Sequence, residues 1–170
     1  MINEGRLVLV VEVAAPPEQV WAAITDWSAQ SDWMLGTTVR ATTVGEEGAP
    51  GRGVGGGIEA WTGLGRFGFL DSMVVTAWDP PRRCVVRHTG AVVRGWGYFV
   101  VRPVAGHPQR SRFLWAEQLN LPLGRVGRVG WHLVRPAFTV GVRASLHAFA
   151  RSLERARADD GLTASMTRGR

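Results

Sequence analysis

Hydrophobic and polar residues alternate along the first part of the chain. One face of an extended segment there carries four apolar side chains, Leu7, Leu9, Val11 and Val13. The opposite face includes the charged residues Arg6 and Glu12. A period of two residues is typical of a half-buried strand, so we predict a β-strand over residues 6–13.

Six further segments have the composition of strands, with β-branched and aromatic residues bounded by turn residues. They lie near residues 37–44, 57–63, 67–78, 83–90, 93–103 and 110–121. Short connections such as Asp79-Pro80-Pro81 and Thr89-Gly90 separate several of them. Because strands joined by short turns pair antiparallel, the pattern favours one antiparallel sheet of seven strands.

Two short helices are predicted after the first strand. Pro16 and Pro17 open the first of them, over roughly residues 17–26, because the first helical turn does not need their missing N–H groups. A second short helix is predicted over about residues 28–34, with Ser28 as its N-cap.

Toward the C-terminus, the period changes from two residues to three or four. Six residues form a single stripe at that spacing, namely Thr139, Val142, Leu146, Phe149, Ala150 and Leu153. Because proline breaks or kinks a helix, Pro136 divides this region into a helical piece over about 124–134 and a long helix over about 136–157. Residues 158–170 are predicted to be a disordered basic tail, which leaves one domain over residues 1–157.

Composition and charge exclude several classes of protein. The hydrophobic content is 45%, and no apolar run is long enough for a membrane-spanning helix or a signal peptide, so we expect a cytoplasmic protein with no stable membrane insertion. Cys84 is the single cysteine. All 20 basic residues are arginine, and residues 125–170 carry the whole net charge of +6. Basic residues there are not interleaved with exposed aromatic residues, so no nucleic acid is expected.

The start of the chain resembles the START-related helix-grip superfamily (SRPBCC), of the polyketide cyclase/dehydrase and lipid-transport type. The resemblance is carried by a strand that leads into Pro16-Pro17-Glu18, a helix that ends at Asp26-Trp27, and Trp33 beyond it. Two later segments, residues 78–83 and 113–117, also resemble the family. The resemblance covers residues 6–157. It implies an α+β helix-grip fold, in which a curved seven-stranded antiparallel sheet wraps around a long C-terminal helix and encloses a cavity.

Two ionisable residues are candidates for the site. Alternation in the last strand places Glu117 on the inner face, in an apolar row. His88 faces inward if Arg87 faces outward. A buried charge needs a partner, a shifted pKa or contact with cavity water. Each residue is therefore either a structural hydrogen-bonding or ion-pairing group, or a polar anchor or general acid/base for a ligand.

Aromatic residues are the other candidates, because small-molecule sites are lined by aromatic walls with few polar groups. Trp115 and Trp131 are the best candidates for the cavity wall. Trp96 and Tyr98 share a face with Arg94 and Arg102, so the orientation of their strand stays open. The predicted ligand-binding residues are therefore His88, Trp96, Tyr98, Phe113, Trp115, Glu117 and Trp131.

A glycine-rich loop over residues 45–57 contains the pattern GxGxxG. A strand follows it rather than a helix, so the pattern does not indicate a dinucleotide site. The loop is either a plain connection or a gate at the cavity mouth, formed by Gly51, Gly53, Gly55 and Gly56. His132 and His147 are too far apart for a local metal pair, and we predict neither a metal nor a cofactor.

Three functions remain open. The first is binding or carriage of a small hydrophobic molecule, and the resemblance implies a lipid, a polyketide or an isoprenoid-like compound. The second is a polyketide cyclase or dehydratase that uses Glu117 and His88 as acid and base. The third is an interaction through the basic C-terminal segment with an acidic partner, a membrane or RNA, which would weaken steeply with salt.

Overall fold

The computed structural model describes residues 4–64, 66–91, 93–120 and 125–168. Its seven strands are β1 (Glu4–Val13), β2 (Thr37–Thr43), β3 (Gly57–Leu64), β4 (Phe67–Asp79), β5 (Arg83–His88), β6 (Gly95–Val104) and β7 (His107–Asn120). They form one antiparallel sheet with the spatial order β1-β7-β6-β5-β4-β3-β2. From β2 to β7, each strand therefore pairs with the next one in the chain.

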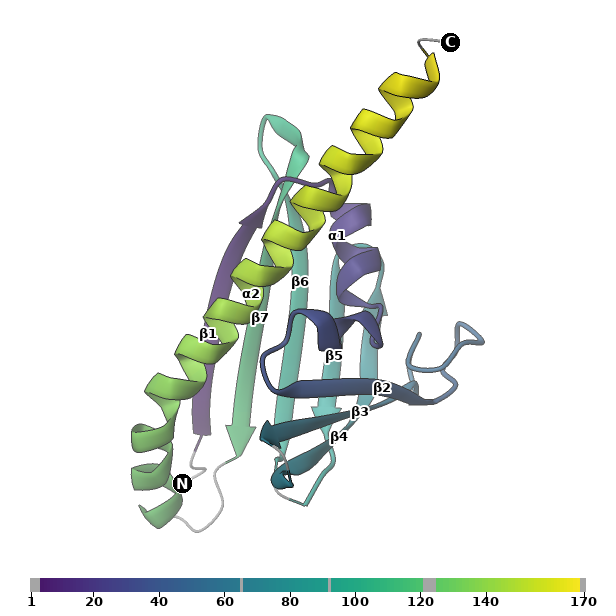
Figure 1. Ribbon diagram of the computed structural model, residues 1–170. Helices are drawn as coiled ribbons and strands as arrows, with labels where there is room; N and C mark the ends of the chain where they lie inside the picture. The colour runs from purple at the N-terminus through teal and green to yellow at the C-terminus, as the bar shows by residue number, and fades with distance from the viewer. Residues whose placement is uncertain (1–3, 65, 92, 121–124, 169–170) are drawn as a thin grey trace.

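The connection from β1 to β2 crosses from one edge of the sheet to the other. It carries α1 (Pro17–Ile24) and η1 (Ala29–Asp32), the two short helices that the sequence predicts. In Figure 1, β2, β3 and β4 run across the direction of β1, β7 and β6, so the sheet is strongly curved. The helix α2 (Arg125–Arg168) lies across this sheet (Figure 1). The predicted α+β helix-grip fold is thus confirmed.

The predicted division of the C-terminal helical region at Pro136 is wrong. The helix α2 has 44 residues and contains Pro136 in its interior. A proline inside a helix removes one hydrogen bond, but tertiary packing supplies most of the stability of a helix in a protein. The same helix continues over residues 158–168, where the sequence predicted a disordered tail.

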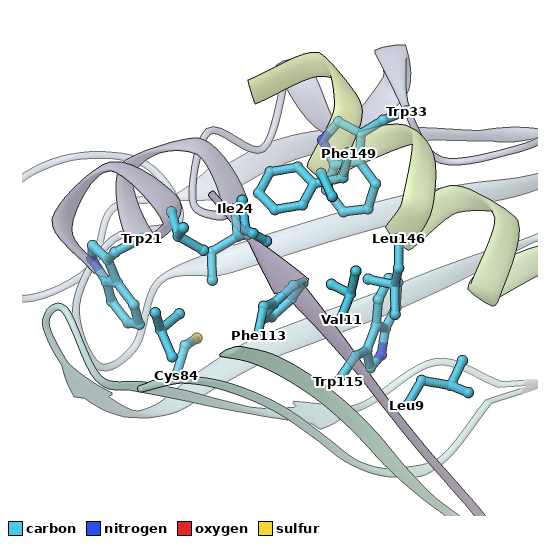
Figure 2. Packing of buried hydrophobic residues seen from close by; sticks show 14 of the residues in the cluster. Leu9, Val11, Trp21, Ile24, Trp33, Cys84, Phe113, Trp115, Leu146 and Phe149 are labelled. Carbon is cyan, nitrogen blue, oxygen red and sulfur yellow. The ribbon is translucent and has the colours of Figure 1, made fainter. Parts of the chain in front are cut away.

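The core lies between the sheet and α2 (Figure 2). Phe113 of β7 and Trp33, which follows η1, both pack against Phe149 of α2, with ring centroids 5.8 and 5.0 Å away respectively. Four members of the predicted helical stripe are buried, namely Val142, Leu146, Phe149 and Ala150. The stripe therefore faces the sheet, as its spacing predicts.

The beginning of α2 packs on the edge strand. Trp131 covers Gly5 of β1 so closely that an added Cβ on Gly5 would lie 2.8 Å from the indole. The ring of Trp131 also meets Phe138 further along the helix, at 6.1 Å between centroids. Glycine at position 5 therefore allows Trp131 to pack directly against the edge strand.

Candidate ligand-binding site

A cavity of about 350 Å³ lies between the sheet and α2. Most of its wall is apolar or aromatic, with contributions from Trp27, Met34, Val39, Ile58, Met73, Phe99, Trp115 and Phe138. Two lining residues, Leu35 and Phe69, are nevertheless 63% and 38% exposed, so they mark the mouth of the cavity. The volume and the lining are typical of a small-molecule site.

Three ionisable side chains meet in the wall of this cavity. His88 of β5 lies between two carboxylates, with Nδ1 2.8 Å from Oδ2 of Asp71 and Nε2 2.9 Å from Oε2 of Glu117. All three residues are buried. We call Asp71, His88 and Glu117 the His88 cluster.

Gly97 explains how His88 and Glu117 can meet, although they stand on β5 and β7 with β6 between them. Gly97 pairs with Glu117 across the β6–β7 ladder and lines the cavity. A Cβ at this position would lie 3.2 Å from Nε2 of His88 and 3.3 Å from Oε1 of Glu117. Because glycine lacks a side chain, the two residues make their hydrogen bond directly over β6.

All but one of the polar atoms of the cluster have a partner. Nε1 of Trp115 donates to Oε1 of Glu117 at 2.6 Å, so both oxygens of Glu117 are hydrogen-bonded. The exception is Oδ1 of Asp71, which is buried and has no hydrogen-bond partner among the described residues. A buried acceptor without a donor costs free energy, and for that reason buried polar groups in proteins are normally paired.

The two carboxylates determine the charge of His88. Burial alone would lower the pKa of the imidazole, but the hydrogen bonds and negative charges of Asp71 and Glu117 outweigh it and raise that pKa to about 10. His88 is therefore protonated at neutral pH and donates from both ring nitrogens. The cluster thus holds one cationic ring between two carboxyl groups.

Cys84 also lines the cavity, but its chemistry is passive. Burial raises the pKa of its thiol to about 12. Because only the thiolate is an effective nucleophile, Cys84 acts as a small apolar wall residue.

The structure brings four of the seven predicted ligand-binding residues to the cavity, namely His88, Trp115, Glu117 and Trp131. Phe113 lies in the core instead, where it packs against Phe99 and Phe149. Trp96 and Tyr98 are not among the lining residues.

The orientation of β6, which the sequence left open, explains the positions of Trp96 and Tyr98. Gly97 and Phe99 face the cavity, so the residues that alternate with them face the opposite side of the sheet. Trp96 is accordingly 38% exposed. Gly97 and Phe99 are thus the cavity residues of β6, in place of Trp96 and Tyr98.

Asp71 is the main residue that the sequence reasoning missed. It shares the inner face of β4 with Met73 and Val75, so it is a carboxylate in an apolar row, like Glu117. The alternation argument that singled out Glu117 would have found Asp71 if it had been applied to residues 67–78.

The four glycines of the predicted gate do not line the cavity, but their loop contacts its wall. Nε1 of Trp27, a lining residue, donates to the carbonyl oxygen of Gly51 at 3.0 Å. The amide of Gly55 and the carbonyl of Gly56 bond to the backbone of Val75, both at 2.9 Å. The loop is therefore attached to the cavity wall through Trp27 and to β4 through Val75.

Neither a metal-binding group nor a membrane-spanning helix is found among the described residues. They include no group of three His, Cys, Asp or Glu side chains arranged to hold a metal ion. None of their helices is both long and apolar enough to cross a membrane.

A comparison with protein families identifies the family to which this fold belongs. The model of the family "Polyketide cyclase / dehydrase and lipid transport" matches residues 5–154. The chain therefore belongs to this family, and the resemblance noted at the start of the sequence is confirmed.

Solved structures show the same fold at low sequence identity. The ZhuI aromatase/cyclase of Streptomyces sp. R1128 is 17% identical, with a TM-score of 0.69 over 90% of this chain and 95% of that one. The protein TTHA0849 of Thermus thermophilus is 14% identical, with a TM-score of 0.71 over 89% and 99%. A norcoclaurine synthase point mutant of Thalictrum is 14% identical, with a TM-score of 0.63 over 92% and 98%. A search among curated proteins gave no significant match.

Proposed function

We propose that the protein binds a small hydrophobic molecule, of lipid, polyketide or isoprenoid type, in the cavity between the sheet and α2. The observation that carries this proposal is a mostly apolar cavity of about 350 Å³ in whose wall the acidic and basic side chains, the His88 cluster, lie together. Binding sites for small molecules combine apolar walls with a few polar groups that fix orientation. The family match to residues 5–154 supports the same class of ligand.

Removal of apolar surface from water drives binding, at about 25 cal/mol per Å². The His88 cluster orients the polar end of the molecule, while Trp115 and Phe99 contact its apolar body. Access is through the mouth marked by Leu35 and Phe69. The glycine-rich loop gates this passage indirectly, through the bond between Gly51 and Trp27.

Two glycines of α2 provide a matched test. An added Cβ meets nothing within 4 Å at Gly141 or at Gly130, but only Gly141 lines the cavity. Gly141→Leu should therefore fill the cavity and weaken binding of an apolar fluorescent probe by about tenfold or more, whereas Gly130→Leu should leave binding unchanged. Equal binding by both variants, measured by fluorescence titration, would show that the probe binds elsewhere.

A second function, cyclase or dehydratase chemistry, is favoured by one observation, the pair of carboxylates around His88. Because His88 is already protonated at neutral pH, it cannot act as the base there. The open acceptor is Oδ1 of Asp71, which can take a proton from a bound substrate. The charge of His88 would then stabilise negative charge that develops on that substrate.

This second function predicts a separation of binding from turnover. In a screen of polyketide-type substrates, Asp71→Asn and Glu117→Gln should each reduce turnover by about 10²-fold or more, while an apolar probe still binds. Unchanged turnover in both variants would remove the His88 cluster from the chemistry. Absence of turnover in the wild-type protein would leave binding as the function.

A further inference from the structure

Oδ1 of Asp71 is the one open position of the His88 cluster. Oδ2 of Asp71 and both oxygens of Glu117 have donors, and both ring nitrogens of His88 have acceptors. Asp71 is only 9% exposed, and it lines the cavity. A molecule in the cavity therefore meets a buried carboxylate oxygen that lacks a donor.

The other polar side chains of the described wall do not supply that donor. Gln30 donates to the carbonyl of Ile24, and Ser145 donates to the carbonyl of Gly141. Thr37 and Thr62 bond to each other at 3.0 Å. These neutral side chains already have partners within the protein.

The ionisable side chains of the described cavity wall also favour a donor that comes from the ligand. The residues that carry them are Asp71, Glu117, His88 and Cys84. The thiol of Cys84 is neutral because burial raises its pKa to about 12, and neither Lys nor Arg is among the lining residues. The described wall thus sets two carboxyl groups against a single basic side chain, His88. A carboxyl group in an apolar surrounding is costly unless a donor or an opposite charge reaches it.

We infer that the natural ligand carries a protonated amine on an apolar body, and that an N–H of this ammonium group donates to Oδ1 of Asp71. This inference rests on the proposed binding function and adds the chemistry of the ligand. An ammonium group supplies the missing donor and brings a positive charge to the second carboxyl group of the wall. A hydroxyl group would supply the donor alone.

Three naphthalene compounds with the same apolar body test this inference, namely naphthylethylamine, naphthylethanol and ethylnaphthalene. Their affinities are measured by isothermal titration near neutral pH. We expect naphthylethylamine to bind about tenfold or more tightly than either of the other two, since a hydrogen bond to a charged group is stronger than a neutral one. Asp71→Asn should abolish this preference and still bind ethylnaphthalene, which shows that the cavity of the variant is intact.

Asp79→Asn is the matched control, because Asp79 stands on the same strand but pairs with Arg82 at the surface. This variant should keep the full preference for the amine. Equal affinity for the three compounds, a preference for naphthylethanol, or an amine preference that survives Asp71→Asn would each overturn the inference. They would leave the proposed binding function standing. If none of the three compounds binds, the proposed function fails together with the inference.

Discussion

At the scale of single residues, three groups distant in sequence determine the polar chemistry of the cavity. Asp71, His88 and Glu117 come from three strands, and Gly97 leaves the space in which two of them meet. Loss of one partner would leave an uncompensated charge in an apolar wall, which usually costs about 3–5 kcal/mol. The cluster therefore affects stability as well as recognition.

The raised pKa of His88 predicts a dependence of stability on pH. Its pKa rises from 6.5 in the unfolded chain to about 10 in the folded protein, so the folded state binds this proton more tightly. The stabilisation is complete below about pH 6.5 and is lost as the pH rises toward 10. The free energy of unfolding should therefore fall between about pH 7 and pH 9, as measured by urea titration.

His88→Gln is the control for this pH effect, because glutamine does not titrate. In that variant, the decline between about pH 7 and pH 9 should be absent or much smaller. The range stops at pH 9 because unfolded Cys84 ionises above that value, near its ordinary pKa of 9.0. An equal decline in the wild-type protein and in His88→Gln would show that His88 is not held protonated by its neighbours.

Gly97→Ala tests whether the missing side chain on β6 permits the cluster to form. The new Cβ would lie 2.9 Å from Cγ2 of Val86 and 3.2 Å from Nε2 of His88. Because Val86 has a stiff β-branched side chain, we expect the variant to lose about 1–3 kcal/mol in the free energy of unfolding. The pH-dependent part of the stability should shrink as well, because the bond between His88 and Glu117 is displaced. Unchanged stability and pH dependence would contradict this role of Gly97.

At the scale of elements, alternation predicted strands well because each strand is buried on one face only. Alternation could not orient β6. One of its faces combines Trp96 and Tyr98 with Arg94 and Arg102, and the other includes glycines, so neither face is clearly the apolar one. Sequence reasoning also failed at Pro136, because local helix preference does not include the packing of α2 on the sheet.

Pro136→Ala provides a prediction for α2. Replacement of an interior proline restores a backbone donor, and the gain exceeds the entropy lost when the unfolded chain becomes more flexible. We expect the free energy of unfolding to rise by roughly 2 kcal/mol. If the proline eases movement of α2 during ligand exchange, release of a bound probe in stopped-flow experiments should also slow. A variant that is less stable than the wild-type protein would show that Pro136 fits the native helix better than alanine does.

At the scale of the whole molecule, the order of elements and the family resemblance were sufficient to predict the fold. Two of the three residues of the His88 cluster followed as well, because Glu117 and His88 each stand out within their own strand. The cluster itself could not be predicted, since the meeting of Asp71, His88 and Glu117 depends on curvature and register across β4 to β7. The cavity was expected from the family resemblance alone, because open space depends on packing across the whole fold and not on any one segment.

The domain boundary near residue 157 remains a prediction, and Arg157 shows where to test it. Its guanidinium donates to the carbonyl of Ala14 and to the side chain of Gln109. A chain that ends at Ala158 keeps these bonds and should match the full protein in melting temperature and probe affinity. A chain that ends at Ala156 loses them and should melt several degrees lower. Loss of probe binding in the longer of the two chains would place residues 159–170 within the binding domain.

Native mass spectrometry of the freshly purified protein, beside Gly141→Leu, tests binding of a hydrophobic molecule in the cavity most directly. Both samples are incubated with a hydrophobic cell extract, then weighed intact and after unfolding. We predict that the wild-type protein carries a discrete added mass that unfolding releases, and that Gly141→Leu carries none. A bare wild-type chain, or an added mass that persists in Gly141→Leu, would contradict a ligand site between the sheet and α2.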